Sequence, residues 1–193
     1  MLRVAATCVG TRALGPGVRS VVWVQGCPFR CRGCVAPEWI PEEGGRSVAV
    51  ADLADEVLAD PDVDGLTLSG GEPMAQAAAL AELVGVVRAR RDVSVVCFTG
   101  YTLGRLRRMP DAAALLSEVD VLIDGQYVER LNDGVGMRGS ANQTVHHLTG
   151  RLAGFDFAGA PRSVEIRVGE RDVTLVGVPP KGLLGVLDRA LGS

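Results

Sequence analysis

Three of the chain's five cysteines lie within eight positions of each other, in the stretch WVQGCPFRCRGCVAPEW (residues 23–39). Cys27, Cys31 and Cys34 form the pattern C-x3-C-x2-C. Thiolates are soft metal ligands, and three of them on one short loop predict a shared metal centre. An odd number of cysteines, clustered in this way, is not typical of a disulfide framework. We therefore expect the reducing environment of the cytoplasm.

The spacing leaves two kinds of metal centre to compare. Structural zinc normally takes four ligands, commonly as two separated pairs. The sequence has no second pair, because Cys8 and Cys97 stand alone in predicted strands and His146 and His147 follow more than a hundred residues later. Ferredoxin spacings differ from this one and supply a fourth cysteine. Three thiolates on a [4Fe-4S] cluster leave one iron open for a substrate or cofactor, and we favour this centre over zinc.

The elements that must position this loop alternate between strands and helices. Strands are predicted at 1–10, 20–26, within 64–73, at 93–98 and at 119–124. Helices are predicted at 50–60, 74–90, 102–109 and 111–118. This alternation indicates βαβ units and a mostly parallel sheet. We expect an α/β fold, in the form of a partial (β/α) barrel of about five to six units.

Four polar or glycine-rich loops follow the carboxyl ends of predicted strands. They are the cysteine loop, SGGEP (69–73), TGYT (99–102) and DGQY (124–127). In parallel α/β folds the carboxyl ends of the strands meet at one edge of the sheet, and sites assemble there. The chemistry is expected at this edge.

These motifs carry a family resemblance. C-x3-C-x2-C followed by GGE after the next strand resembles the radical S-adenosylmethionine (SAM) superfamily. The stretches GPGVRSVVWVQGCPFRCRGCVAPEW, LTLSGGEPM, FTGYTL and DVLIDGQY…MRGSANQ resemble, more closely, the activating enzymes of glycyl-radical enzymes. That group includes the activating enzymes of anaerobic ribonucleoside-triphosphate reductase and of pyruvate formate-lyase. The resemblance covers roughly residues 12–148.

The resemblance implies two cofactors, a [4Fe-4S] cluster held by the three cysteines and SAM bound to its open iron. One electron would cleave SAM to methionine and a 5′-deoxyadenosyl radical that abstracts hydrogen. No catalytic residue is expected beyond the ligands of cluster and SAM. The implied SAM-binding residues are Gly33, Gly70, Gly71, Glu72, Thr99, Gly100, Asp124 and Gln126. Among them, Glu72 would bind the SAM amino group, because a carboxylate suits an ammonium.

A glycine-rich loop is expected to form the mouth of the site. GVGMRG (134–139) matches G-x-G-x-x-G by letter, but it follows no strand and opens no apolar helix, so we do not interpret it as a dinucleotide site. The substrate-mouth candidates in and after this loop are Arg138, Ser140, Asn142 and Gln143. His146 and His147 alternate on a predicted strand and favour packing over catalysis.

The C-terminal part follows a different pattern. Residues 163–178 predict a two-stranded hairpin that turns at residues 169–171, followed by a helix from about residue 181. We expect a radical SAM core domain over residues 1–150 and a C-terminal hairpin–helix extension over residues 151–193, packed on the core. The extension is a candidate lid.

Three functions stay open at this stage. The leading hypothesis is an activase that removes hydrogen from a backbone glycine of a partner glycyl-radical enzyme. The alternative is a radical SAM enzyme that modifies a small metabolite or a ribosomal peptide; an iron–sulfur electron carrier is distant, because a carrier needs no SGGEP loop. A flavodoxin or ferredoxin is the expected electron donor. The net charge of −3 gives no electrostatic case for nucleic acid, and the longest apolar runs fall short of a membrane span.

Overall fold

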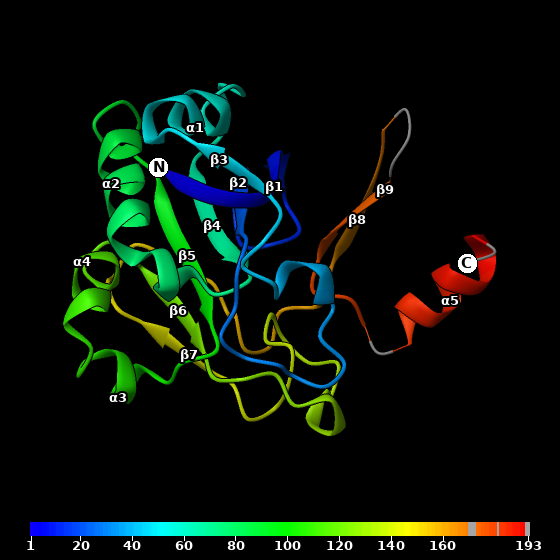
Figure 1. Ribbon diagram of the computed structural model, residues 1–193. Coiled ribbons are helices and arrows are strands. Elements are labelled where there is room, and N and C mark those ends of the chain that lie inside the picture. The colour runs from blue at the N-terminus through cyan, green and yellow to red at the C-terminus, as the bar shows by residue number, and fades with distance from the viewer. Residues whose placement is uncertain (170–172, 181, 192–193) are drawn as a thin grey trace.

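The computed structural model describes residues 1–169, 173–180 and 182–191, and its centre is a seven-stranded sheet (Figure 1). The strands lie in the order β3-β1-β2-β4-β5-β6-β7. Their bounds are Leu2–Thr11 (β1), Arg19–Val24 (β2), Arg46–Val48 (β3), Gly65–Gly70 (β4), Ser94–Thr99 (β5), Val121–Asp124 (β6) and Thr144–His147 (β7). The predicted α/β class is confirmed.

The parallel part of the sheet is smaller than predicted. Strands β2, β4, β5 and β6 pair in parallel, whereas β1 pairs antiparallel with β2 and β3, and β7 pairs antiparallel with β6. The short link from β1 to β2 contains no crossover helix, and a parallel pair requires a crossover connection. Among the described strands the parallel block therefore has four members. The predicted five to six units and the partial barrel are not confirmed by these pairings.

The two longest predicted helices are present in the structure as regular α-helices. The predicted helices at 50–60 and 74–90 are confirmed as α1 (Val50–Val57) and α2 (Ala77–Arg88), the latter preceded by the 3-10 turn η2 (Pro73–Gln76). The predicted helices at 102–109 and 111–118 are single turns, α3 (Leu103–Leu106) and α4 (Ala113–Leu116). Pro110 explains the interruption between them, because proline lacks the N–H that a continuous helix needs. The remaining 3-10 turns are η1 (Pro37–Trp39), η3 (Pro110–Ala112) and η4 (Glu129–Leu131).

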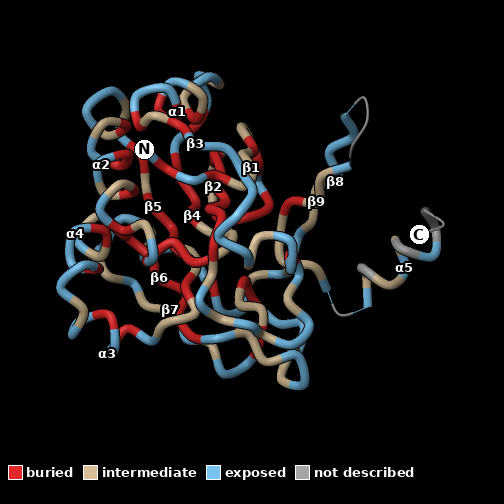
Figure 2. The backbone as a smooth tube through the Cα atoms, in the orientation of Figure 1, coloured by how far each residue is buried: buried red, intermediate tan, exposed pale blue. Residues whose placement is uncertain are grey.

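The two faces of the parallel block bury different groups. On one face α1, α2 and α4 pack on alternate strand residues such as Val22, Leu68 and Cys97 to form the main core. The other face presents the intervening residues, including Trp23 and Phe98, to smaller clusters. In Figure 2 the buried positions follow the central strands and the sheet-facing side of these helices. This second face is therefore left to build a site.

The C-terminal segment leaves the sheet. Strands β8 (Val164–Val168) and β9 (Val173–Gly177) form the predicted hairpin, and α5 spans Leu183–Leu191. Of the predicted turn, residues 170 and 171 lie outside the described residues, as does the predicted helix start at residue 181. Figure 1 shows the hairpin and α5 projecting from the body of the molecule, although Val176 is fully buried against the second face. No helix in the described part of the chain is long and apolar enough to cross a membrane.

Candidate functional site

The cysteine loop is closed at its base by Gln25, the residue after β2. The Gln25 side-chain amide donates to the backbone carbonyls of Glu38, Pro41 and Glu43 at 3.1, 2.8 and 3.2 Å. Next to it, Gly26 N donates to Trp39 O at 3.0 Å. Because Gln25 is 5% exposed, these bonds are shielded from water and hold both ends of the loop together.

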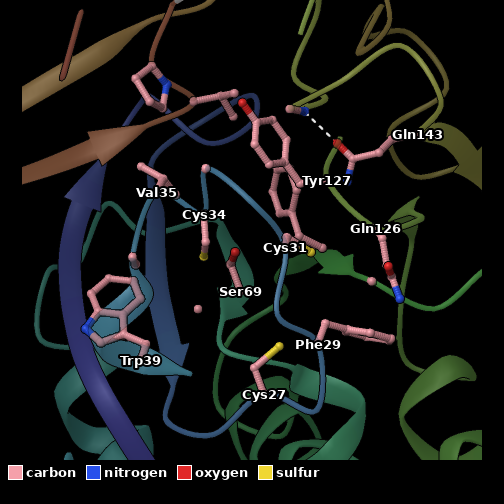
Figure 3. Close-up of a pocket in the computed structure, with 18 of the residues that line it drawn as sticks. Cys27, Phe29, Cys31, Cys34, Val35, Trp39, Ser69, Gln126, Tyr127 and Gln143 are labelled. Atoms are coloured by element: carbon pink, nitrogen blue, oxygen red, sulfur yellow. Dashed lines mark hydrogen bonds between the residues drawn. The ribbon is translucent and has the colours of Figure 1, made fainter. Parts of the chain in front are cut away.

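The three cysteines line one cavity of about 450 Å3. All three are free thiols of intermediate burial, and Figure 3 shows the side chains of Cys27 and Cys34 pointing into the space between the loops. Cys34 N donates to Cys31 O at 3.2 Å, which forms a tight turn. Gly33 in this turn has φ +72°, and a methyl group on it would lie 2.8 Å from Glu129 Cδ. The turn therefore requires glycine at residue 33.

Burial favours the protonated form of two of these thiols, Cys27 and Cys31, because it raises the pKa of each. It raises the pKa of Cys27 to about 11, and the neighbouring Glu72 carboxylate and the other two cysteines add to the effect. The pKa of Cys31 is also raised, first by burial and then by Cys34. Metal ligands must be thiolates, so loading this site releases protons.

The donor set of the cavity suits an iron–sulfur cluster. In a [4Fe-4S] cluster each cysteine binds its own iron. Three free thiols that line one cavity fit three such ligands. Within the described residues, no three His, Cys, Asp or Glu side chains are grouped to hold one metal ion.

The glycine pair after β4 is packed against the start of the cysteine loop. A methyl group on Gly70, which has φ +98°, would lie 2.5 Å from Val24 N, and one on Gly71 would lie 2.2 Å from Gly26 O. Gly71 N donates to Val24 O at 2.7 Å. Both glycines are therefore required by close contact between backbones, whatever ligand the cavity receives.

Glu72 joins the loops that follow β4 and β5. Its carboxylate Oε1 accepts from Met74 N at 2.9 Å and from Thr99 Oγ1 at 2.7 Å, and Oε2 accepts from Gly100 N at 2.8 Å. Glu72 is 1% exposed, and burial raises its pKa against the lowering effect of these three bonds. A carboxylate offers about four acceptor positions, so one position on Oε2 stays available.

Most of the predicted site residues are brought together. The predicted residues that line the cavity are Cys27, Cys31, Gly33, Cys34, Gly70, Gly71, Glu72, Thr99, Gly100, Gln126 and Gln143. Gln143 holds the loop around it, since it donates to Gly125 O and accepts from Gly139 N, both at 2.7 Å. The carboxyl ends of the parallel strands do meet at one site, as predicted.

Four predicted residues lie outside the cavity lining. Asp124 Oδ2 accepts from Leu103 N at 2.5 Å and lies 2.9 Å from His146 Nε2, so it anchors α3 and β7. The side chains of the mouth candidates Arg138, Ser140 and Asn142 instead bond to nearby loop residues: Arg138 pairs with Asp133 at 2.7 Å, and Ser140 Oγ donates to Asn142 Oδ1 at 2.8 Å. Ser140 Oγ also accepts from Val128 N at 3.1 Å, and Asn142 Nδ2 donates to Gln126 O at 2.8 Å. His147 is exposed and packs edge-to-face on Phe157, in agreement with a packing role.

Sequence reasoning missed the aromatic wall of the cavity and the individual residues of its C-terminal wall. The aromatic residues are Trp23, Phe29, Trp39, Phe98 and Tyr127, of which Figure 3 labels Phe29, Trp39 and Tyr127 around the cysteines. The C-terminal wall consists of Gly177, Val178, Pro179, Pro180, Gly182 and Gly185. Strand alternation could have placed Trp23 and Phe98, because both face away from the main core. The sequence predicted the C-terminal extension as a candidate lid but identified none of the residues of this wall.

Comparison with known proteins agrees with the cysteine site. A family model described as a 4Fe-4S single cluster domain matches residues 13–146, which include the whole cysteine loop and β2 to β6. The match defines the class as a single-cluster iron–sulfur protein. It ends before β8, β9 and α5.

Curated relatives narrow this class. Proteins named anaerobic ribonucleoside-triphosphate reductase-activating protein are 38% identical over 145 residues in Vibrio cholerae (70% of this chain, 91% of the relative) and 34% identical over 148 residues in Escherichia coli K12 (69% and 91%). The phage T4 protein of that name is 34% identical over 137 residues (68% and 85%). The chain belongs to this family of radical SAM activating enzymes, whose cofactors are a [4Fe-4S] cluster and SAM.

Proposed function

We propose that this chain cleaves SAM reductively and removes a hydrogen atom from a backbone glycine of an anaerobic ribonucleoside-triphosphate reductase. The proposal is carried by the cavity in which three free thiols meet the glycine-rich ends of β4 and β5. The partner is taken from the name of the relatives. The finer description of the fold, a sheet rolled into a partial barrel around this cavity, is part of the same proposal.

The three cysteines that line the cavity would hold the cluster. When bound, the cluster supplies one electron to the SAM sulfonium, whose C–S bond breaks to give methionine and a 5′-deoxyadenosyl radical that takes hydrogen from the substrate. Cys27, Cys31 and Cys34 would each ligate one iron. Gly33, which also lines the cavity, could contact the cofactors only through its backbone.

Glu72 and the glycine loops would hold SAM. The acceptor position left on Glu72 Oε2 suits the SAM ammonium, while its other bonds keep the carboxylate from turning. Thr99 and Gly100, tied to the same carboxylate, would contact the ribose or methionine portion. Gln126 would approach from the end of β6, and the aromatic walls with Phe29 and Tyr127 would limit access of water to the reacting bond.

We also propose the electron donor and the cellular compartment of the reaction. A flavodoxin or ferredoxin would supply the electron, and the cytoplasm would be the compartment. Five free cysteines support a reducing environment, because oxidising compartments favour disulfides.

Anaerobic reconstitution tests the proposal. We expect about four iron and four sulfide per chain, release of 5′-deoxyadenosine and methionine from SAM after reduction, and a glycyl radical by electron paramagnetic resonance when the reductase of the same organism is added. Stoichiometric zinc without iron would contradict the cluster. SAM cleavage that leaves the reductase without a radical would contradict the reductase as the proposed partner protein.

The C-terminal wall supports a second candidate, a radical SAM enzyme for a small metabolite or a ribosomal peptide. Gly177 to Pro180 line the cavity from a segment beyond the family match, and such a wall could enclose a free substrate. The proposed division into a core domain (1–150) and an extension (151–193) bears on this candidate, because the extension would supply the enclosing wall. Turnover of a small substrate without any partner protein would favour the second candidate.

A further inference from the structure

Arg162 connects the C-terminal segment to the mouth loop, which we define as residues 132–143. Its Nε donates to Gly136 O at 3.1 Å, and its Nη2 donates to Arg138 O at 2.5 Å and to Gly139 O at 3.4 Å. Arg162 itself lies after the family match, which ends at residue 146. A residue outside the shared region thus holds a loop inside it.

The same guanidinium also bonds to the C-terminal wall. Arg162 Nη1 donates to Asn132 Oδ1, at the start of the mouth loop, at 2.8 Å and to Pro179 O, in the C-terminal wall, at 3.1 Å. Asn132, Gly139 and Pro179 all line the cavity, whereas Arg162 does not. One side chain therefore bridges the mouth loop and the C-terminal wall.

The chemistry of arginine explains why this residue type occupies the position. Guanidinium carries five N–H donors in one rigid plane, and Arg162 makes five bonds, all to neutral carbonyl or amide oxygens. A lysine ammonium has three donors at one point and cannot satisfy acceptors distributed in this way. Half-burial lowers the pKa of Arg162 while the nearby Asp133 opposes that shift.

The mouth loop also rests on the segment that leads to Arg162. Met137 N donates to Phe157 O at 2.9 Å. Gly136 has φ +64°, and a methyl group on it would lie 2.2 Å from Ala158 O. The sequence predicted a glycine-rich loop at the mouth of the site, and the structure holds this loop against residues 157–162.

We propose that Arg162 is a positioning residue that sets the width of the cavity mouth, and with it the size of the group that can approach Cys27, Cys31 and Cys34. The consequence, that this width selects an extended glycine segment as substrate, rests on the proposed function. The geometric part does not.

Thiol labelling of the full-length chain before cluster reconstitution tests the width directly. Iodoacetamide serves as the small reagent and a polyethylene-glycol maleimide as the bulky one, with the rate at each cysteine followed by mass spectrometry. In Arg162→Met the bulky reagent should label the three cavity cysteines about tenfold faster, as expected for loss of charged hydrogen bonds that oppose local opening. The small reagent should change much less.

Two further variants make the result specific. Arg167→Met is the matched control, because Arg167 also joins the C-terminal segment to a core carbonyl, Gly10 O at 2.9 Å, but lies outside the cavity lining. It should leave both rates unchanged. Arg162→Lys keeps the positive charge without the planar fork and should behave mostly like Arg162→Met. A lysine variant with wild-type rates would overturn the inference.

The buried cysteines control for unfolding. Cys8 is 8% exposed and Cys97 is fully buried, so both should stay unlabelled in any folded variant. If Arg162→Met exposes them, Arg162→Lys carries the test. Unchanged bulky-reagent rates in a folded Arg162 variant contradict the inference, even if SAM is cleaved. Conversely, a protein that shows the widened mouth but cleaves no SAM contradicts the proposed function and leaves this inference standing.

Discussion

Two charged side chains buried at opposite ends of the parallel strands, Arg19 and Glu72, are used differently. Arg19 lies at the amino ends of β2, β4 and β5 and is fully buried, while Glu72 lies at their carboxyl ends and is 1% exposed. Neither has an ion-pair partner of opposite charge within 4.0 Å among the described residues. Both depend on hydrogen bonds to neutral groups instead.

At the amino end the hydrogen bonds use all five N–H donors of the Arg19 guanidinium. Arg19 Nε donates to Thr67 Oγ1 at 2.8 Å, Nη1 to Pro16 O and Ser94 Oγ at 3.1 and 3.0 Å, and Nη2 to Leu66 O and Ser94 O at 2.5 and 3.1 Å. Burial lowers the pKa of Arg19 to about 10, so it stays charged at neutral pH. This end is closed and holds three strands together.

At the carboxyl end the hydrogen bonds leave a cavity. Glu72 joins two loops but retains one acceptor position on Oε2, and the cavity of about 450 Å3 lies beside it. Loops diverge after the carboxyl ends of parallel strands, which leaves room for ligands. We therefore expect substitutions at the amino end to affect the stability of the fold, and substitutions at the carboxyl end to affect cofactor binding and chemistry.

The largest effect is expected from the cysteines. A triple Cys27/Cys31/Cys34→Ala protein should fall from about four iron atoms per chain to none after reconstitution. Iron analysis and the absorption spectrum measure this. Cys8→Ala and Cys97→Ala are the controls and should retain the cluster, because both thiols lie in hydrophobic clusters away from the cavity lining. Iron loss in either control would contradict the separation of the two regions.

Removing the amino-end charge should reduce stability strongly. Arg19→Met leaves up to five acceptors without a donor, and we expect the free energy of unfolding to fall by roughly 3–5 kcal/mol. Denaturant unfolding measures the loss. Arg19→Lys retains the charge but has fewer donors, so its free energy of unfolding should lie between those of the wild type and Arg19→Met. Iron content per folded chain should not change, and a loss of cluster from folded Arg19→Met would break the comparison.

Removing Glu72, the buried charge at the carboxyl end, should affect SAM binding more than the stability of the fold. Glu72→Ala should weaken SAM binding ten- to hundredfold, equivalent to roughly 1.5–3 kcal/mol for a charged hydrogen bond. The cluster should still assemble, because the carboxylate is proposed to bind the ammonium and not iron. Equilibrium binding of SAM to the reconstituted protein provides the measurement. Unchanged affinity would show that Glu72 serves the loops alone.

A matched pair of glycines sharpens the comparison. A methyl group on Gly65 would lie 2.2 Å from Arg19 Nη1, while one on Gly100 would lie 2.5 Å from the Phe29 ring. Arg19 is held by its bonds, whereas Phe29 is half-buried at the cavity and can turn. Gly65→Ala should therefore cost about 1–3 kcal/mol of unfolding free energy and Gly100→Ala clearly less. Thermal unfolding of both variants measures the difference, and the reverse order would contradict it.

The smallest effect is a pH dependence from Glu72. Because burial raises its pKa in the folded protein, the folded state binds this proton more tightly than the unfolded state does. The stability of the wild type relative to Glu72→Gln should fall as pH rises from the ordinary glutamate value, about 4.3, through the raised one, with a slope of at most about 1.4 kcal/mol per pH unit. Denaturant titrations of both proteins across this range measure the slope. A rising difference would mean that the three hydrogen bonds outweigh burial.

Local sequence patterns were sufficient to predict those parts of the molecule that depend on residues close together in the sequence. The cysteine spacing predicted a cluster site, and the alternation of strands and helices predicted the parallel block β2-β4-β5-β6 with α1 and α2. The strand ends predicted which loops would meet. Each of these depends on a spacing of a few residues or on the rule that parallel strands end at one edge.

Contacts between distant segments could not be predicted in this way. Nothing near Asp124 in the sequence indicated that it would bond to Leu103 N and to His146, and nothing near Arg162 indicated a mouth loop that begins 30 residues earlier. Such bonds form only after the sheet has brought the segments together. Motif spacing therefore determined which residues carry the chemistry, and tertiary packing decided which polar side chains remain free to use it.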